Sequence, residues 1–353
     1  MARKLKIKSP KEQLTLFDFS EEFMPETSKL PVHPSIEAFV MESASEKTAT
    51  ETFDDGTIDL MQPINMLTSV DSISFISFGS GSSGNCSYIG DSTGGFLIDA
   101  GVDVDKIKEG LEHKGLSMEN VKGVCLTHDH SDHVRYVYSL VRKYRHIGVY
   151  CTPRTFNGIM RRHSISRRLK DYHRPIYKEF PFKIGDFDIV AFEVSHDGTD
   201  NSGFFITHGH HRFAVATDLG CVTPRVDHYM RMAQYIMIES NYDEKMLAEG
   251  RYPAHLKARI KAENGHLSND DAARFLAQCC SDRLRYIFLC HLSADNNTPE
   301  LALDAVRSAL ASAGFDEVGN GDGSIESRRC GLQLMVLPRY DASPLITLRH
   351  VDD

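Results

Sequence analysis

From residue 72 onward, short apolar runs alternate with segments in which apolar residues recur at helical spacing. Apolar runs bounded by turn residues predict β-strands, and the helical spacing predicts helices between them. We therefore expect an α/β domain. The predicted strands are 73–78, 96–101, 121–126, 147–151, 188–194, 203–206, 213–216, 236–241, 286–290 and 331–337. The predicted helices follow residue 133, span 153–162, lie within 243–263, begin at Ser268, and run from Thr298 to about Ala313.

The first 71 residues differ from the rest, because they are rich in Glu, Ser, Thr, Lys and Pro and lack sustained alternation. This composition predicts a disordered N-terminal tail at 1–71, followed by a folded domain at 72–340 and a C-terminal tail at 341–353. Within the N-terminal tail, Gln13, Leu14, Leu16 and Phe17 resemble the motif that binds the bacterial replication clamp. A short anchor on a flexible tether could recruit the domain to that clamp. An apolar turn that docks on its own domain is the alternative.

The stretch 127–133 holds three imidazoles and two carboxylates, directly after a predicted strand and before a helical pattern. His128 and His130 are two apart on extended backbone, so they share a face and can reach one metal ion. Asp132 and His133 fall at the start of the helix and aim beside the first ion, which predicts a second one. Packing does not explain this pattern, since each buried polar group would cost desolvation without a partner.

The ends of other predicted strands carry further candidate ligands. His196 is the third imidazole for the first ion, His291 is a ligand for the second, and Asp218 is placed to bridge both. Asp99 is predicted to orient a ligating histidine or its loop. The histidines within 207–212 look similar, but a polar turn between strands 203–206 and 213–216 favours a hairpin instead.

Composition indicates where in the cell the protein is located and the redox state of its cysteines. The chain has 353 residues, of which 41% are apolar, and no run approaches the roughly 18 to 20 apolar residues of a membrane span. The basic N-terminus lacks the apolar core of a secretory signal, so we expect a cytoplasmic protein with no membrane partner. Eight scattered cysteines without a C-x-x-C pair predict buried, reduced thiols.

The net charge of −9 argues against nucleic acid, but the distribution of charge does not. Between Arg135 and Lys183 there are 13 Lys or Arg and two acidic residues, a balance of +11 against −20 elsewhere. Such a basic block near a metal centre would hold a polyanion. A solvated helical face is the alternative. The predicted contacts are Arg161, Arg162, Arg167 and Arg168.

A glycine-serine loop spans 79–86, between the predicted strand 73–78 and residues 87–89. Its glycines allow close approach of the backbone to a ligand, and Ser83 and Asn85 offer hydrogen bonds to phosphate. An ordinary strand connection explains the loop equally well.

The ordered set of candidate ligands resembles the metallo-β-lactamase superfamily. That resemblance implies a four-layer αββα sandwich with a two-metal site along one edge of the paired sheets, so 72–340 would be a hydrolase domain. The finer pattern is similar to the YycJ (WalJ) family of exonuclease-like proteins. It is carried by segments 81–86, 97–101, 239–243, 265–269, 291–293 and 296–298. The 72 residues between Asp218 and His291 are too few for the large extra domain of the β-CASP nucleases.

The family resemblance implies a DNA phosphodiesterase, namely a 5′ to 3′ exonuclease in replication or repair with two divalent ions, zinc or manganese. A hydroxide held by the ions would attack phosphorus while Asp132 steers the water or accepts its proton. His266 would contact the scissile phosphate or protonate the leaving oxygen, although a helix-start histidine that bonds backbone is equally expected. Asn241 would support a ligand, and Ser268 and Asn269 would contact substrate.

Two other functions remain open from the sequence. A small-molecule ester or thioester hydrolase of the same fold would turn over neutral esters without dependence on salt. A non-catalytic, clamp-associated adaptor would not need the complete ligand set.

Overall fold

The computed structural model of the protein describes residues 72–322 and 330–349. The predicted clamp motif at 13–17 therefore lies outside the described residues, as does the rest of the predicted N-terminal tail.

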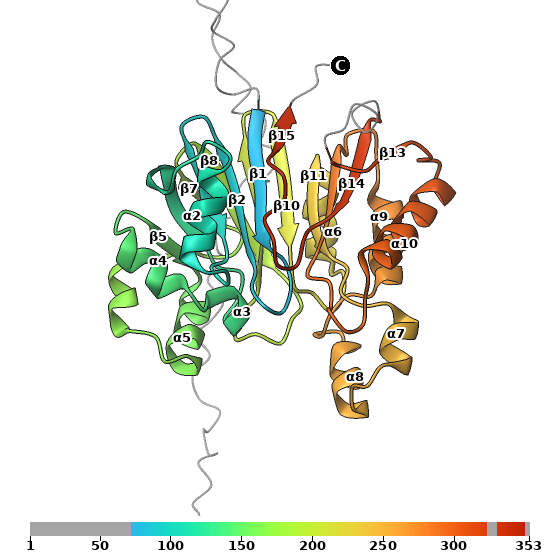
Figure 1. Ribbon diagram of the computed structural model, residues 1–353, viewed down its shortest axis with the longest axis horizontal. Helices are drawn as coiled ribbons and strands as arrows, with labels where there is room; N and C mark the ends of the chain where they lie inside the picture. The colour runs from blue at the N-terminus through green and yellow to red at the C-terminus, as the bar shows by residue number, and fades with distance from the viewer. Residues whose placement is uncertain (1–71, 323–329, 350–353) are drawn as a thin grey trace, which may run out of the picture. The chain divides into compact units, whose positions relative to one another are not determined.

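Two mixed β-sheets form the centre of the domain (Figure 1). Sheet A has antiparallel pairing from β15 to β3 and parallel pairing from β3 to β6. Its order is β15 (Ile346–Arg349), β1 (Ser72–Gly79), β2 (Cys86–Asp91), β3 (Gly94–Ile98), β4 (Val121–Cys125), β5 (Gly148–Cys151) and β6 (His173–Pro175).

Sheet B has parallel pairing from β13 to β10 and antiparallel pairing from β10 to β7. Its order is β13 (Val318–Gly319), β14 (Leu332–Val336), β12 (Tyr286–Cys290), β11 (Tyr235–Glu239), β10 (His211–Ala216), β9 (Ser202–His208), β8 (Phe187–Glu193) and β7 (Pro181–Ile184).

The two sheets pack face to face through large apolar side chains. Alternation along β1 sends Ile73 and Phe75 into the core between the sheets, while Ile76 and Phe78 face the helices outside sheet A. The Phe75 ring lies 4.4 Å from the Phe288 ring of sheet B, measured between centroids. Strands buried on both faces explain why the sequence shows continuous apolar runs rather than simple alternation.

Helices cover the outer face of each sheet. The apolar sides of α2 (Val104–Glu112), α4 (Val137–Lys143) and α5 (Pro153–Arg162) join the core outside sheet A. On sheet B, α6 (Pro224–Met232) contacts β8 and β10, and α10 (Pro299–Ser312) contacts β14 and α9 (Asn269–Cys279). The predicted four-layer αββα arrangement is therefore confirmed.

The predicted helix after residue 133 is instead two short helices, α3 (Ser131–Val134) and α4. Two carbonyls that would continue α3 are used elsewhere, since the amides of Asn85 and Ala100 donate to Asp132 O and His133 O. The amide of Tyr136 then turns away from the helix and donates to Ala100 O at 2.9 Å. Tertiary hydrogen bonds of the loop around the candidate ligands thus end α3 early.

The prediction of a C-terminal tail at 341–353 is wrong for its middle part, because residues 346–349 form β15 at the edge of sheet A. The short edge strands β6, β7 and β13 were also not predicted. All three are four residues or fewer, which is too short for a periodic signal. The basic segment before β6 contains a 3₁₀ helix, Arg167–Asp171, and a second one spans Met118–Asn120.

Two other sequence-based expectations concern cysteines and membranes. All eight cysteines are free thiols, and five of them are buried. Among helices in 72–322 and 330–349, none combines the length and apolar character that crossing a bilayer requires.

Candidate metal centre

The predicted ligands converge where strands of the two sheets end. They follow the carboxyl ends of β4 in sheet A and of β8, β10 and β12 in sheet B, and Asp99 follows β3. His196, Asp218 and His291 all lie beside the loop of 128–133 rather than pointing away from it. Among the described residues, the groups that could hold a metal ion all belong to this one centre. They consist of His128, His130, His196 and Asp218; of Asp132, His133 and His291; and of Asp218, His266 and His291.

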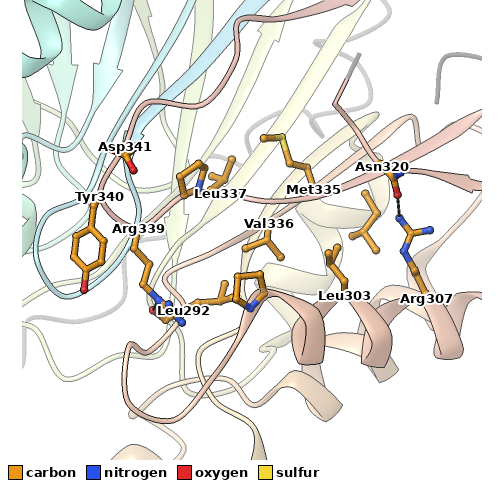
Figure 2. A pocket seen from close by; sticks show the side chains of 13 residues that line it. Leu292, Leu303, Arg307, Asn320, Met335, Val336, Leu337, Arg339, Tyr340 and Asp341 are labelled. Carbon is orange, nitrogen blue, oxygen red and sulfur yellow. Dashed lines mark hydrogen bonds between the residues drawn. The ribbon is translucent and has the colours of Figure 1, made fainter. Parts of the chain in front are cut away.

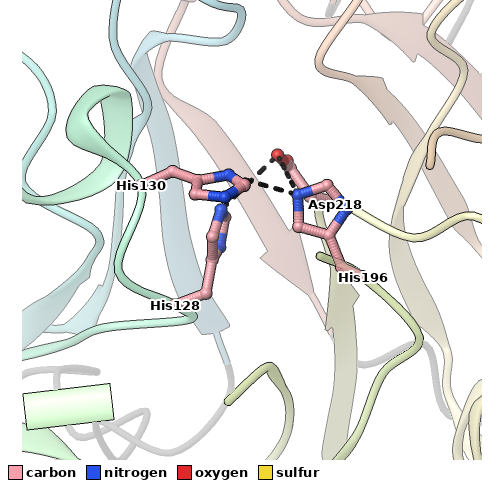
Figure 3. Close-up of side chains that lie close together, drawn as sticks. All are labelled: His128, His130, His196 and Asp218. Atoms are coloured by element: carbon pink, nitrogen blue, oxygen red, sulfur yellow. Dashed lines mark hydrogen bonds and ion pairs between the residues drawn. The ribbon is translucent and has the colours of Figure 1, made fainter. Parts of the chain in front are cut away.

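The first group combines three imidazoles with one carboxylate, and Figure 3 shows these side chains directed toward a common point. Asp218 Oδ2 lies 3.7 Å from His128 Nε2 and 3.6 Å from His196 Nε2. His130 Nδ1 lies 3.3 Å from His196 Nε2. The donor atoms thus surround a space between them rather than bonding one another tightly.

The second group shares Asp218 with the first. His133 Nε2 lies 3.4 Å from Asp218 Oδ2, and His291 Nδ1 lies 3.3 Å from Asp218 Oδ1. Asp132 Oδ2 is 3.6 Å from His133 Nε2 and 3.5 Å from His291 Nε2. The Asp218 carboxylate therefore lies between the two groups and contacts both, as a bridging ligand requires.

Three atoms of the centre are buried without a hydrogen-bond partner, namely His128 Nε2, His291 Nε2 and Asp218 Oδ1. Leaving a buried polar atom unpaired costs about 1 to 3 kcal/mol. A divalent cation would satisfy these atoms, and nitrogen and carboxylate donors suit zinc or manganese. The side chains present therefore fit the metal ions that the sequence predicts.

On the side of sheet A, buried hydrogen bonds orient two of the imidazoles. Asp99 Oδ2 lies 2.7 Å from His133 Nδ1, and Asp99 also accepts from the amide and hydroxyl of Thr127. The Thr127 hydroxyl lies 3.0 Å from His128 Nδ1. Asp99 thus holds both rings with their Nε2 atoms toward Asp218, which is the position predicted for it.

On the side of sheet B, the organising residue is Glu239, which the sequence analysis did not single out. Its buried carboxylate lies 2.8 Å from Nδ1 of both His291 and His266, and it accepts from the Leu219 amide. Asn241 donates to Glu239 Oε1 and to the His291 carbonyl. An acid that ends an otherwise apolar strand was the available signal for Glu239.

Asp129 is a second acid without a predicted role, although it lies between two candidate ligands. Its carboxylate is fully buried and accepts from the Thr199 amide and hydroxyl in the loop after His196. A Cβ at Gly158 of α5 would lie 2.2 Å from Asp129 Oδ2, so only glycine allows the helix this close. Asp129 therefore joins the ligand loop, α5 and the His196 loop.

Asp197 links the centre to the helical segment between β11 and α9. Its Oδ1 lies 3.2 Å from His130 Nε2, while Arg259 donates from Nε to its Oδ2 at 2.8 Å. Arg259 belongs to α8 (Ala254–Ile260), which follows α7 (Glu244–Glu249). A carboxylate on the far nitrogen of a ligating histidine fixes the orientation of its ring. Asp197 is therefore a positioning residue for His130.

The pKa values of the four imidazoles shift in opposite directions. Burial lowers the pKa of His128 well below its ordinary value, and burial also lowers the pKa of His130. Burial acts in the same direction on His133 and His291, but Asp218 and the other carboxylates outweigh it and raise both pKa values. Several buried carboxylates thus draw positive charge to this point. Bound cations would supply that charge and displace the two protons.

The backbone is also unusual at two of these residues. Asp99 has φ of 63° and His291 has φ of 54°, in the left-handed region that few residues other than glycine adopt. Such conformations cost on the order of 1 to 3 kcal/mol and persist only where surrounding contacts impose them. Both residues therefore adopt a strained backbone conformation that directs their side chains at the centre.

Of the predicted substrate contacts near the centre, Ser83 is exposed, but the other three are engaged internally. Asn85 Nδ2 contacts Asp132 and His133, so it supports candidate ligands. The prediction that Ser268 and Asn269 contact substrate is wrong in this structure, because they are 1% and 2% exposed. Ser268 caps α9, as predicted, and Asn269 bonds Ser240 and Asn297.

The predicted arginine contacts lie on α5 and the 3₁₀ helix that follows. Arg161, Arg167 and Arg168 are exposed, while Arg162 is exposed but directs Nη1 to Asp129 Oδ1 at 3.3 Å. Other cations of the basic block are neutralised by acids from outside it. Lys143 pairs with Asp105, Lys178 with Glu193 and Asp200, and Lys183 with Asp188.

The histidines at 208–211 are not part of any candidate metal group among the described residues. His208 and His211 pair across the β9–β10 hairpin. His208 Nε2 lies 3.3 Å from Asp91 Oδ2. The predicted hairpin is therefore confirmed.

A hollow of about 500 Å³ lies away from the metal centre, between α10, β14 and 337–341 (Figure 2). Most of its lining is apolar, and Arg339 stands at one end of it. The Arg339 guanidinium donates to the carbonyls of Leu292, Ser293 and Asn297. Arg339 therefore fixes the loop that follows His291.

If Asp197 positions His130, variants of Asp197 and Arg259 should differ in their affinity for zinc. Asp197→Asn should weaken binding of zinc by about 10- to 100-fold, the usual effect of losing a partner of a ligating histidine. Arg259→Gln should weaken it less. Because Arg259 acts through Asp197, the double variant should bind zinc as weakly as Asp197→Asn alone. Calorimetric titration of each variant with zinc measures these affinities.

A matched control for this experiment lies on the same helix. Lys257 donates to the Ala248 carbonyl and does not contact Asp197. Lys257→Gln should therefore leave the affinity unchanged. Additive losses in the double variant would contradict the positioning role.

Comparison with known proteins agrees with the geometry of this centre. The family model of the β-lactamase superfamily domain matches residues 95–289. Exodeoxyribonuclease YycJ of Bacillus anthracis is 34% identical over 242 residues, which cover 67% of this chain and 88% of the relative. Exodeoxyribonuclease WalJ of Streptococcus pneumoniae is 34% identical over 235 residues, which cover 66% of this chain and 87% of the relative.

Solved structures show the same fold. The metallo-β-lactamase fold protein YhfI of Bacillus subtilis aligns with a TM-score of 0.55 and 14% identity, covering 77% of this chain and 99% of YhfI. The chain therefore belongs to the metallo-β-lactamase superfamily and, within it, to the family of YycJ and WalJ.

Proposed function

We propose that this protein is a metal-dependent phosphodiesterase that acts on DNA, as a 5′ to 3′ exonuclease in replication or repair. The names of the YycJ and WalJ relatives support the class of reaction. The observation that carries the proposal is the set of buried, unpaired donor atoms that face one another where the strands of both sheets end. No other group of described residues offers a comparable set.

We assign His128, His130 and His196 to one ion, Asp132, His133 and His291 to the other, and Asp218 to both. Divalent ions held there would supply a Lewis acid for the phosphate and a hydroxide near neutral pH.

Two groups with partial access to solvent are available for proton transfer. The Asp132 carboxylate is 17% exposed and lies at the solvent side of the second group, where it can orient water or accept its proton. The His266 imidazole is 24% exposed and is oriented by Glu239 through Nδ1. We assign His266 to the scissile phosphate or the leaving oxygen, because a polar contact to a buried acid fixes its ring beside the centre.

The exposed arginines of α5 and 167–168 support DNA as the substrate. α5 packs directly on the ligand loop at Asp129, and its Arg162 contacts that loop. Phosphate contacts by such residues position a nucleic acid without reading its sequence. Ser83, which is exposed at the tip of the glycine-serine loop, is the remaining candidate for a phosphate contact.

Recruitment and location are proposed from sequence alone. The clamp-like residues Gln13, Leu14, Leu16 and Phe17 would bring the enzyme to replicating DNA in the cytoplasm. Binding to the clamp stays a prediction.

Removal of a candidate ligand should abolish cleavage. His128→Ala and Asp218→Ala should each lower the rate on end-labelled single- and double-stranded DNA with manganese by more than about 100-fold, since loss of even an outer partner of a ligand costs 10- to 100-fold. The products of labelled DNA also give the polarity. His210→Ala serves as the matched control, because this residue lies in the hairpin turn outside the metal groups.

An unchanged rate in either ligand variant would remove the metal mechanism. Turnover of neutral esters or thioesters without cleavage of DNA would favour a small-molecule hydrolase. Absence of both activities in the metal-loaded protein would favour a clamp-associated adaptor.

Neutralising Arg161, Arg162, Arg167 and Arg168 to Gln should weaken DNA binding and flatten its dependence on salt. Each lost phosphate contact reduces the slope of log affinity against log salt by about 0.9 for double-stranded DNA. Fluorescence anisotropy at several salt concentrations measures the slope. Lys143→Gln and Lys183→Gln are controls, because acids outside the block already pair with these lysines. A constant slope in the arginine variant would count against this surface.

A further inference from the structure

A small pocket adjoins the metal centre on the side of α8. Its cavity measures about 180 Å³, and His266 and Asp197 form part of its lining. Both residues contact the centre, since His266 belongs to a candidate metal group and Asp197 contacts His130. The other lining residues are Ser82, Asn241, Tyr252, Leu256, Arg259, Ile260, Gly265 and Ser293.

The helix that forms one wall of this pocket has an unusual role in the fold. None of the residues of α8 is buried, so the helix contributes nothing to the domain core. Its apolar residues Leu256 and Ile260 are half-buried and line the pocket instead. Polar contacts hold the segment in place, because Ser195 donates to Glu263 O and His196 Nδ1 contacts Gly265 O. The segment is therefore organised around the pocket and the centre.

Three cations of α8 and the residue after it are engaged within the protein. Lys257 donates to Ala248 O, Arg259 is held by Asp197, and Lys261 pairs with Glu244. Arg161, Arg162, Arg167 and Arg168 lie on or directly after α5, and Figure 1 shows α5 and α8 far apart. The two sides thus differ: one is basic and open, and the other is a small pocket of mixed polarity.

We propose that this pocket is the subsite for the nucleoside of the terminal nucleotide that the enzyme releases. The inference rests on the proposed nuclease function and deepens it. The polyanionic part of the substrate would lie along α5, its scissile phosphate at the metal centre, and one base with its sugar against Tyr252, Leu256 and Ile260.

The chemistry of the lining favours a nucleoside. The Tyr252 hydroxyl donates to Asp295 Oδ2 at 2.7 Å, which fixes the ring before substrate binds. A fixed aromatic ring stacks any base at low entropic cost. The exposed Ser82 and the neighbouring Ser293 add hydrogen-bonding groups that suit a sugar or a base edge. An acyl chain would need a more uniformly apolar lining.

The size of the pocket limits how much substrate it can take. Sites for drug-sized ligands are about 300 to 1,000 Å³, so 180 Å³ suits one nucleoside at most. A substrate end that fits one unit at a time would be shortened stepwise. The pocket thus gives a physical reason for exonucleolytic rather than internal cleavage.

Two diesters that differ only in the nucleoside test this subsite. The full-length protein with manganese should hydrolyse the p-nitrophenyl ester of thymidine 3′-monophosphate, whose nucleoside is joined to the phosphate through O3′ as at a 5′ end, with a lower KM than bis(p-nitrophenyl) phosphate. Tyr252→Ala should raise the KM for the nucleotide ester about tenfold, since stacking on one aromatic residue has an effect of that order. Its kcat, and hydrolysis of bis(p-nitrophenyl) phosphate, should stay within about twofold of wild type.

Further variants keep the test independent of one substitution. Tyr252→Phe retains the ring and should have a much smaller effect, while Leu256→Trp should fill the pocket and reproduce the rise in KM. Tyr340→Ala is the control, because Tyr340 is also a tyrosine that solvent reaches, being 59% exposed, but lines the hollow away from the centre.

The outcomes separate the two proposals. Hydrolysis of neither diester by the wild-type protein would overturn the nuclease function itself. Hydrolysis of both with no preference for the nucleotide ester, or an equal loss on both diesters in Tyr252→Ala and Leu256→Trp, would overturn the nucleoside subsite alone.

Discussion

Burial of several carboxylates in a small volume is the constraint on which this structure depends. Asp99, Asp218 and Glu239 are each at most 5% exposed, yet each has low-dielectric surroundings that penalise its charge. The protein compensates with imidazoles and backbone amides, but three donor atoms stay unpaired. Without bound cations, nothing would compensate the remaining free-energy cost of these buried charges and unpaired atoms. The αββα architecture is therefore best understood as a scaffold for a cationic centre, in agreement with its family.

The two sheets contribute to that centre in different ways. Sheet A supplies a continuous loop, 128–133, whose side chains are set by local spacing and by Asp99. Sheet B supplies single residues from separate strand ends, and Glu239, the last residue of the central strand β11, contacts His291 and His266. The helical segment with α8 then reaches the centre only through polar contacts of Asp197 and the chain near Gly265. The two packed sheets thus hold the candidate ligands, while the segment with α8 forms a wall of the pocket beside them.

The sequence allowed the strands, the fold class and the seven converging residues to be predicted, because each ligand follows a strong apolar run or sits in a dense His–Asp stretch. Glu239 and Asp197 were missed because neither stands in such a pattern. Glu239 is the last residue of a predicted strand, and Asp197 resembles a turn residue beside a histidine. Their roles depend on partners 27 and 62 residues away. The basic block was overestimated as well, because acids outside it neutralise several of its lysines.

The pairing of β15 with β1 affects how the domain tolerates shortening and fusion. β15 covers the outer backbone groups of β1, which would otherwise form a long, mostly apolar open edge in sheet A. Open edges of this kind invite association with other chains. A protein that ends before residue 346 would keep every candidate ligand and yet be prone to aggregate, so purification tags and crystallisation boundaries belong beyond residue 349 rather than at the end of the catalytic motifs.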